Sequence, residues 1–249
     1  MNIVIPMAGL GSRFASAGYR APKPLIDVAG KPMIVRVMEN LRQPGVGFTL
    51  LARKEHIDSN KELVAQIQSD FNAVFVPIDK LTEGTACTVL FARSHLEPTE
   101  EVVIANSDQI IDDCFTQFLL DAKARDLDGS ILTFIDAELN PKWSFAKIDA
   151  EGLVTEVQEK KAISEFATVG IYYFKRADEL VDGIIQMIIE NDRVNNEFYT
   201  CPVYNYLIRK GKRVGIFNIE QSQMHGIGTP DDLNAYLLLG RDVSKLTAS

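Results

Sequence analysis

A glycine-bearing loop between a short apolar run and an amphipathic stretch is the feature that most constrains the fold of this chain. The apolar run is Ile3-Val4-Ile5, and a helical spacing of apolar residues begins near Met33. These patterns predict a buried strand that leads into a loop and then into a helix. Within the loop, Gly9 and Gly11 are expected to adopt positive φ and to bring backbone N–H groups close to a ligand.

The loop is basic, although the protein as a whole is acidic. Residues 1–36 hold five Lys or Arg, Arg13 and Lys23 among them, against the single acid Asp27. The whole chain of 249 residues carries a net charge of −8. Positive charge beside glycine backbone indicates a site for a polyanionic small molecule, and a phosphate compound is the first candidate.

Two common phosphate-binding loops do not fit this segment. The dinucleotide pattern G-x-G-x-x-G fails at Phe14, and the second apolar run, 48–51, ends in Ala52-Arg53 instead of an acid. The P-loop pattern G-x-x-x-x-G-K-[ST] occurs nowhere in the chain. Neither a dinucleotide-binding fold nor a P-loop NTPase is therefore predicted.

The segment resembles the signature of the nucleotidyltransferases that activate sugar phosphates and related phosphate monoesters. That signature runs G-x-G-x-R, then P-K-P-L after a spacer, then G-K-P-[ML]. The matching residues are Gly9, Gly11, Arg13, Pro22-Lys23-Pro24-Leu25 and Gly30-Lys31-Pro32-Met33. The resemblance implies that a nucleotide binds along the backbone of Met7, Ala8, Gly9 and Gly11. It also implies catalytic roles for Arg13 at the β- and γ-phosphates and for Lys23 near the α-phosphate.

The same resemblance implies a metal site and a nucleobase site further along the chain. Asp108 follows the apolar run 102–105 and would bind Mg²⁺, the expected cofactor; a helix N-cap is the alternative role. Thr82, Gly84 and Thr85 resemble the turn that reads the nucleobase, with Gly84 letting the base approach the backbone. A plain capped turn is the alternative reading of that segment.

The acceptor would bind in the second half of the chain. Glu159 and Lys160 resemble the start of the family's E-K-P segment, and Gly170 lies in a segment that resembles N-T-G-I-Y. Glu197 falls where relatives place a second acceptor-binding glutamate. The proline and the asparagine of these motifs are replaced here by Lys161 and Ala167, so an unusual acceptor is expected.

The chain departs from the family once more near its end. The segment 224–229 resembles W-x-D-x-G-T, whose Asp is a second metal ligand, but Gly226 occupies the position of that Asp. Either one metal ion suffices, or another group such as His225 or Glu197 takes the place of the missing ligand. Imidazole is a poor ligand for Mg²⁺, which disfavours His225.

Alternating apolar runs and helical patterns predict the fold class. The expected class is α/β, with a mostly parallel, Rossmann-like sheet flanked by helices. From about Trp143, strands at 145–148, 153–157 and 169–174 follow one another without helices, and we expect them to form a small antiparallel substrate-binding flap. One domain, 1–249, is predicted, with residues 1–140 binding the nucleotide and 141–249 binding the acceptor.

Composition excludes several partners. The chain has no apolar run of eighteen residues, so no membrane span is expected, and a cytoplasmic protein is predicted from an N-terminus without a signal peptide. The acidic balance disfavours nucleic acid as a partner. Three cysteines without metal-like spacing indicate reduced thiols. The sequence leaves open whether the protein is a homo-oligomer.

The predicted reaction follows from the resemblance. An NTP, with CTP favoured, would react with a phosphomonoester acceptor to give a nucleotide-linked product and pyrophosphate, in the synthesis of capsule or other envelope polysaccharide precursors. A nucleotide-sugar glycosyltransferase of related fold is one alternative, although Asn106-Ser107-Asp108 lacks the D-x-D pattern of those enzymes. A non-catalytic nucleotide-binding sensor is the other.

Overall fold

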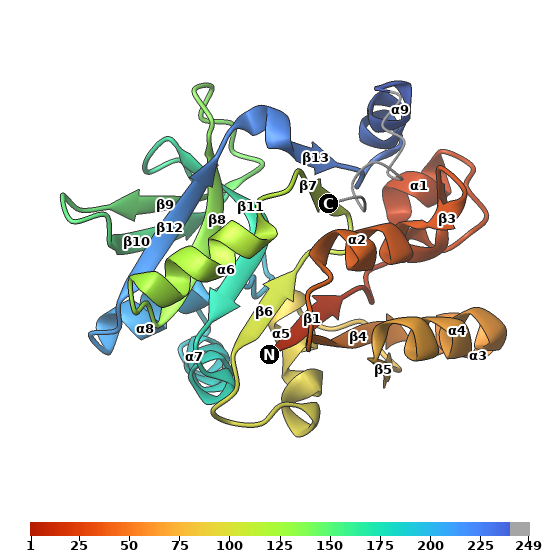
Figure 1. The fold of residues 1–249 in the computed structure, drawn as a ribbon, viewed down its shortest axis with the longest axis horizontal. Coiled ribbons are helices and arrows are strands. Elements are labelled where there is room, and N and C mark those ends of the chain that lie inside the picture. Colours follow the sequence, from red (N-terminus) through yellow and green to blue (C-terminus); the bar gives the residue numbers. More distant parts are fainter. Residues whose placement is uncertain (240–249) are drawn as a thin grey trace.

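The core of the protein is a nine-stranded mixed sheet, shown in Figure 1. The computed structural model describes residues 1–239. Along the sheet the strands run β10-β9-β11-β6-β1-β4-β5, and β8 and β12 continue it from β11. The strands are β1 (Asn2–Pro6), β4 (Gly47–Arg53), β5 (Ala73–Ile78), β6 (Val102–Ala105), β8 (Gly129–Ile135), β9 (Ser144–Ile148), β10 (Val154–Glu159), β11 (Phe166–Phe174) and β12 (Val214–Ile219).

The N-terminal half of the sheet is parallel, as the alternating pattern predicts. β1 lies between β4 and β6, with Asn2 opposite Gly47 and Val102, and β4 pairs with β5. Strand β1 is buried on both faces, with Ile3, Val4 and Ile5 fully excluded from solvent. The carboxyl ends of these strands gather at one edge, where ligands bind in such sheets. The predicted α/β class with flanking helices is confirmed.

The strand at 169–174 lies in the central sheet and not in a separate flap. As part of β11 it pairs antiparallel with β6 through Ile171–Phe174 on one side, and with β8 on the other. Strands β9 and β10 form an antiparallel pair at the end of the same sheet, where β9 joins β11 at Ala167. The long apolar run of β11 agrees with this place, because a central strand is buried on both faces.

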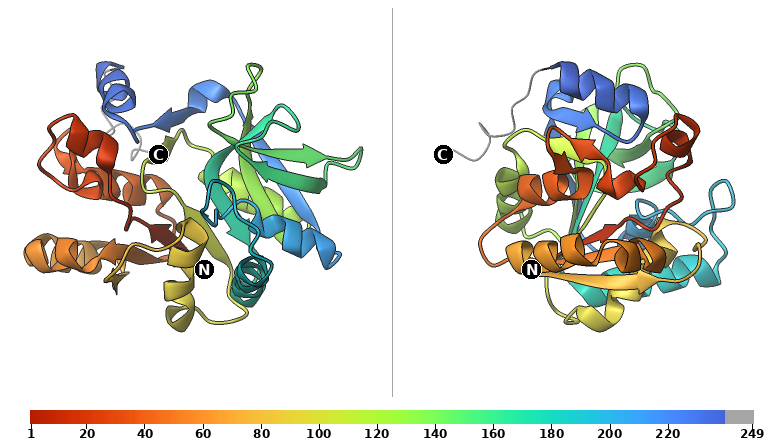
Figure 2. Two further views of the ribbon diagram at one scale, coloured as in Figure 1. Left: turned by 180° about the vertical axis from the view of Figure 1, so that it is seen from behind. Right: turned by 90° about the vertical axis from the view of Figure 1, so that its right-hand side faces the viewer.

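Helices cover both faces of the sheet. On one face α2, α4 and α6 bury side chains such as Ile34, Ile67 and Phe118, and on the other α5, α7 and α8 bury Ala86, Leu180 and Val203. Figure 1 is seen from the side of α2 and α6, and the left view of Figure 2 from the side of α5 and α7. These helices are α2 (Met33–Leu41), α4 (Lys61–Phe71), α5 (Thr85–Val89), α6 (Phe115–Ala124), α7 (Ala177–Ile189) and α8 (Val203–Arg209).

Smaller elements lie around the ends of the strands. Residues Ile57 to Phe71 form two helices, α3 and α4, because the side chain of Asn60 donates to the carbonyl of His56 and competes with the helical pattern. The smaller elements are α1 (Ser12–Ser16), η1 (Lys23–Leu25), β2 (Asp27–Val28), β3 (Lys31–Pro32), α3 (Lys54–Ser59), η2 (Leu90–His95), β7 (Gln109–Ile111), η3 (Gln221–Gln223), β13 (Met224–Gly226) and α9 (Pro230–Leu238).

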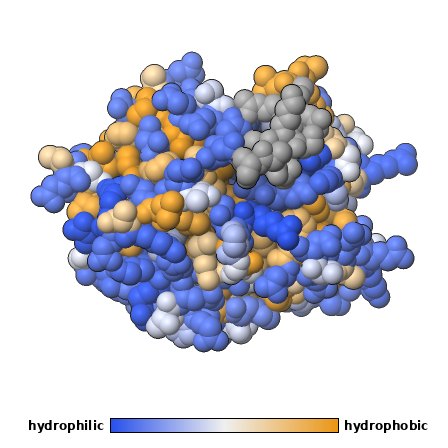
Figure 3. Space-filling view, viewed as in Figure 1, coloured by the Kyte–Doolittle hydropathy of each residue, from blue (hydrophilic) through white to orange (hydrophobic). Residues whose placement is uncertain are grey.

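The outer surface is mostly hydrophilic on the face that Figure 3 shows. Exposed large hydrophobic residues, such as Leu120 on α6 at 60% exposure, are scattered among polar ones. Such isolated residues are ordinary on protein surfaces. Among the described residues, no helix has both the length and the apolar character needed to cross a membrane.

Candidate functional site

An open cleft lies at the carboxyl ends of β1 and β6. It encloses about 390 Å³, a size that suits a small organic ligand. The cleft brings together eight of the predicted site residues from segments far apart in the chain. They are Met7, Gly9, Gly11, Arg13, Lys23, Thr85, Asp108 and Glu197. The other wall residues, which were not predicted site residues, are Pro6, Ser12, Phe14, Pro24, Asn106, Ser107 and Gly228.

The glycine loop folds back so that Lys23 lies against Gly11. Gly11 has φ +61°, and a Cβ added there would come within 2.9 Å of the Cβ of Lys23. A side chain at position 11 would therefore displace Lys23. Gly9 does not adopt the expected positive φ, but it has no neighbour within 4 Å of an added Cβ. Its backbone thus borders open space at the cleft wall, where a ligand can approach it closely.

Lys23 forms an ion pair with Asp108 across the cleft. Each side chain is 19% exposed. The pair joins the basic loop to the end of β6, although the two residues are 85 positions apart in the chain. Asp108 is not a helix cap, since β7 follows it and α6 begins only at Phe115. The structure therefore places a carboxylate and an ammonium group together at the sheet edge where a ligand is expected.

The segment after β12 supports Asp108 from the other side. Strand β13 pairs with β7 so that Gly226 lies opposite Gln109, and the N–H of Ile227 donates to the carbonyl of Asp108 at 2.9 Å. A Cβ at Gly228 would come within 2.3 Å of Asp108 Oδ2, so this position has no room for a side chain. At Gly226, by contrast, the nearest atom to an added Cβ is Gln109 Oε1 at 4.0 Å, which leaves space.

His225 does not line the cleft. Its Nε2 lies 3.1 Å from Asp112 Oδ1, and its ring packs beside Tyr236. The alternation of side chains along β13 sends His225 to the face opposite that of Gly226. Glu197, the other group considered as a second metal ligand, shares the cleft with Asp108.

The close contact that requires glycine at position 84 is not the one with a nucleobase that the sequence predicts. Its φ is +123°, and a Cβ there would come within 2.4 Å of the carbonyl oxygen of Phe198. The backbone that approaches Gly84 closely is thus the protein's own. Thr85 is the first residue of α5 and does not cap it, and its hydroxyl accepts a hydrogen bond from Thr200. The hydroxyl of Thr82 contacts Thr88 and the carbonyl of Gly84 and is not part of the cleft wall.

The spacing of apolar residues predicts a helix over 197–209, and this contact explains why the helix begins only at Val203. Phe198 donates its N–H to the carbonyl of Glu83 and accepts from the N–H of Ala86, at 2.8 and 3.0 Å. These bonds hold residues 197–200 against the turn 82–86. The helical spacing in the sequence could not reveal this, because the bonding partner lies more than a hundred residues away.

Glu159 and Lys160 lie at the end of β10, beside the cleft. Glu159 is buried and accepts a hydrogen bond from Ser144. Burial raises the pKa of Glu159, and the nearby Glu197 carboxylate acts in the same direction, while Ser144 and Lys160 oppose the shift. Lys160 follows in a left-handed backbone conformation, with φ +54°. Neither residue is part of the cleft wall itself, but the charge of Glu159 is within range of that of Glu197.

Gly170 and Ala8 support the cleft from behind. Gly170 has φ +93°, and a Cβ there would overlap Asn106 Nδ2 at 2.1 Å. The N–H of Asn106 also donates to the carbonyl of Gly170 at 2.9 Å. Gly170 therefore sets the position of Asn106, which does line the cleft. Ala8 is 7% exposed and packs in the core beneath the loop.

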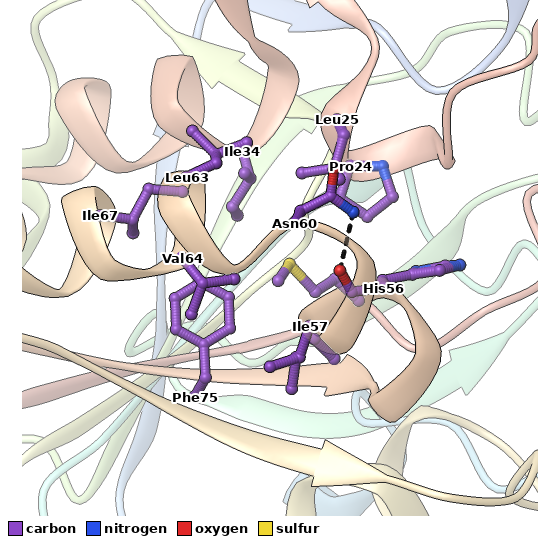
Figure 4. Close-up of a pocket in the computed structure, with 12 residues that line it drawn as sticks. Pro24, Leu25, Ile34, His56, Ile57, Asn60, Leu63, Val64, Ile67 and Phe75 are labelled. Atoms are coloured by element: carbon purple, nitrogen blue, oxygen red, sulfur yellow. Dashed lines mark hydrogen bonds between the residues drawn. The ribbon is translucent and has the colours of Figure 1, made fainter.

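A second pocket lies behind the loop and is almost entirely apolar. Figure 4 shows Pro24 and Leu25 on one side of it, facing Leu63 and Val64 of α4, with the Asn60–His56 hydrogen bond at its rim. Its free space is about 20 Å³, enough for one water molecule. This pocket is too small for a nucleotide.

Comparison with known proteins agrees with this arrangement. The model of the nucleotidyl transferase family matches residues 3–236. The bifunctional protein GlmU of Methanocaldococcus jannaschii is 25% identical over 96% of this chain and 54% of its own length. The mannose-1-phosphate guanylyltransferase catalytic subunit beta of Xenopus tropicalis is 28% identical over 71% of this chain and 50% of its own length. The chain thus spans about half the length of the curated relatives it matches.

Two solved structures share the fold over nearly the whole chain. A nucleoside-diphosphate-sugar pyrophosphorylase from Vibrio cholerae has a TM-score of 0.82 at 24% identity, covering 95% of this chain and 99% of its own. The inositol-1-phosphate CTP transferase of T. maritima has a TM-score of 0.74 at 15% identity, covering 99% and 98%. With the motif loop, the strand-end aspartate and the family match in agreement, this chain belongs to the nucleotidyl transferase family.

Proposed function

We propose that this protein transfers a nucleotidyl group from an NTP to a phosphate monoester and releases pyrophosphate. The observation that carries the proposal is the meeting of Lys23 and Asp108 in one cleft, lined also by Gly9 and Gly11. A cation and a carboxylate at a glycine-lined wall suit a triphosphate bound with a divalent metal ion.

The chemistry needs few groups from the protein. An oxygen of the acceptor phosphate attacks the α-phosphorus, and the bond from that phosphorus to the bridging oxygen breaks as pyrophosphate leaves. The acceptor phosphate is already mostly dianionic near neutral pH, so no general base is required. What the protein must supply is alignment of two polyanions and positive charge between them. We assign this charge to Arg13 at the β- and γ-phosphates and to Lys23 at the α-phosphate.

The oxygen-rich wall of the cleft fits Mg²⁺. Among residues 1–239, no three acidic, His or Cys side chains group into a metal cage. Mg²⁺ binds well with one or two carboxylates, waters and substrate phosphates, so Asp108 with a triphosphate suffices. Asp108 would hold the ion, with Glu197 as the other carboxylate of the cleft, and the ion would supply positive charge beside the triphosphate.

The remaining roles divide between the two sides of the cleft. We assign nucleotide binding to the backbone of Met7, Ala8, Gly9 and Gly11 and to the turn that holds Thr82, Gly84 and Thr85. Acceptor binding is assigned to the end of β10 and its neighbours, which are Glu159, Lys160, Gly170 and Glu197. We further propose CTP as the nucleotide and a capsule or envelope precursor as the product. The support is the resemblance of the motif loop to small capsule enzymes, and the fold shared with an inositol-1-phosphate CTP transferase.

A pyrophosphate-release screen tests the proposal. Each of the NTPs is combined with a panel of phosphomonoesters that includes glucose 1-phosphate, mannose 1-phosphate and inositol 1-phosphate, with and without Mg²⁺. We expect release that requires both substrates and the metal, and that is fastest with CTP. In a parallel assay with nucleotide sugars and sugar acceptors, release of a nucleoside diphosphate would favour a glycosyltransferase. Nucleotide binding without any turnover would favour a sensor.

A further inference from the structure

A short strap, residues 193–200, crosses from the turn at 82–86 to the acceptor side of the cleft. Asn195 and Asn196 both have positive φ, and Val194 bridges to Glu197, so the strap begins with a tight hairpin turn. Beyond the turn, the two backbone hydrogen bonds of Phe198 fix the strap against residues 83 and 86. The path of the strap is therefore set by these backbone contacts and by the ion pair between Arg193 and Glu83, none of which involves the side chain of Tyr199.

Successive side chains of the strap point in opposite directions, as in any extended segment. Phe198 is 1% exposed and packs in the core, with the guanidinium of Arg193 4.2 Å from the centre of its ring. Glu197 and Tyr199 lie on the other side. Glu197 lines the cleft, and Tyr199 contacts Lys160 at the end of β10.

Tyr199 holds the ammonium group of Lys160 by two contacts. Lys160 Nζ donates to the Tyr199 hydroxyl at 2.5 Å and lies 4.5 Å from the centre of the ring. The second contact is a cation–π interaction. The backbone of Lys160 is also fixed, because its N–H donates to the carbonyl of Trp143 at 3.0 Å. A long lysine side chain loses its rotamer freedom here without pairing to an acid.

The absence of an acid partner makes the charge of Lys160 available. Among residues 1–239, no acid lies within the ion-pair distance of 4.0 Å from Lys160 Nζ, although the charge of Lys160 lowers the pKa of Glu159. The Tyr199 hydroxyl also lies within electrostatic range of Glu197.

We propose that Tyr199 is a positioning residue that holds Lys160 ready to bind the phosphate of the acceptor. The inference rests on the proposed nucleotidyl transfer and adds to it a residue outside the family motif loop. Without the hydroxyl, the ammonium group can swing toward Glu159 or Glu197 and must be drawn back when the acceptor binds. The loss therefore concerns the acceptor and not the nucleotide.

Steady-state kinetics with each substrate varied in turn test the inference. Tyr199→Phe keeps the ring and removes the hydroxyl, and we expect the acceptor KM to rise about tenfold, the effect of one hydrogen bond to a charged group. The KM for the NTP should change less than about twofold. Tyr206→Phe is the matched control, because Tyr206 also has a cation over its ring, Arg209 at 4.6 Å, and bonds to acids, but on α8 away from the cleft. It should leave both KM values unchanged.

A double-mutant cycle separates positioning from a purely structural role. In a Lys160→Ala background, adding Tyr199→Phe should raise the acceptor KM no further, since the group to be positioned is gone. Full additivity, or a Tyr199→Phe variant with wild-type acceptor KM, would overturn the inference while leaving the proposed function intact. A wild-type protein that releases no pyrophosphate with any NTP and acceptor would overturn the proposed function, and the inference with it.

Discussion

The two sides of the cleft differ in how their charged side chains are paired. On the nucleotide side, Arg13 and Lys23 come from one short loop, and Lys23 is neutralised by Asp108 from across the cleft. On the acceptor side, Glu159 is buried and Lys160 is held by a tyrosine, on segments brought together from β10 and the strap. A triphosphate carries enough charge to compete with an ion pair. A monophosphate carries less, and a prepositioned, unpaired cation suits it better.

The largest expected effect tests the nucleotide side. Lys23→Ala should lower turnover about a hundredfold, or about 2.7 kcal/mol in activation free energy, through loss of one charge contact to the transition state. Lys31→Ala is the control, because Lys31 belongs to the same loop but pairs with Glu39. Near wild-type turnover of Lys23→Ala, or equal losses in both variants, would contradict the assigned role.

The second-largest effect tests the contact between the turn 82–86 and the strap. In Gly84→Ala the new methyl group meets the backbone of Phe198 within 2.4 Å, so the strap and the turn must separate. We expect unfolding free energy to fall by about 2 kcal/mol. Gly211→Ala shares a positive φ but has no neighbour within 4 Å, and should lose only about 1 kcal/mol. Denaturant unfolding measures the free energy of unfolding of both variants. An equal loss in the two would show that the strap moves away from the turn without an energetic cost.

A smaller effect concerns the support of Asp108. Gly228→Ala places a methyl group on Oδ2 of Asp108, and we expect turnover to fall about tenfold as the carboxylate moves away. Gly226→Ala, two residues earlier, has room for its methyl group and should retain turnover. Activity measured against Mg²⁺ concentration should show a raised midpoint for the first variant only. Equal midpoints in the two variants would indicate that Asp108 has a structural role and does not bind the metal ion.

The smallest effect is the pH dependence of stability on the acceptor side. Because burial raises the pKa of Glu159, the folded state binds more protons than the unfolded state just above the usual glutamate pKa. The contribution of Glu159 to the free energy of unfolding therefore falls as pH rises from the usual glutamate pKa to the raised pKa of Glu159. The Glu159→Gln variant has no titrating group at this position, so its Tm should rise relative to the Tm of wild type as pH increases through this window. Glu156→Gln in the same strand is the control, and parallel Tm curves for Glu159→Gln and wild type would refute the claim.

The nucleotide side was largely predictable because its information is local. Gly11, Lys23 and their neighbours lie within a few tens of residues, and glycine and proline restrict the backbone strongly enough to carry the loop's shape in the sequence. The strand before the loop and α2 after it follow from apolar spacing. Within this loop the conformation of Gly9 differed from the expectation, since its φ is not positive.

The acceptor side was less predictable because its contacts join distant segments. Glu159, Lys160 and Glu197 were named from short motifs, but nothing near them in the sequence indicates the hydrogen bond from Ser144 or the contact with Tyr199. Likewise, the helical spacing after Glu197 predicts a helix there. The backbone bonds of Phe198 to residues 83 and 86 prevent it.

By itself, the sequence determined the α/β class, the strand–loop–helix at the N-terminus and most residues of the cleft. These features depend on apolar periodicity and on the backbone preferences of glycine and proline, which act over short distances. Only the tertiary structure decided that β11 enters the central sheet, that Gly84 faces Phe198 and that Lys160 meets Tyr199. Such contacts depend on which segments pack together, and that is settled by the burial of the whole core rather than by any local pattern.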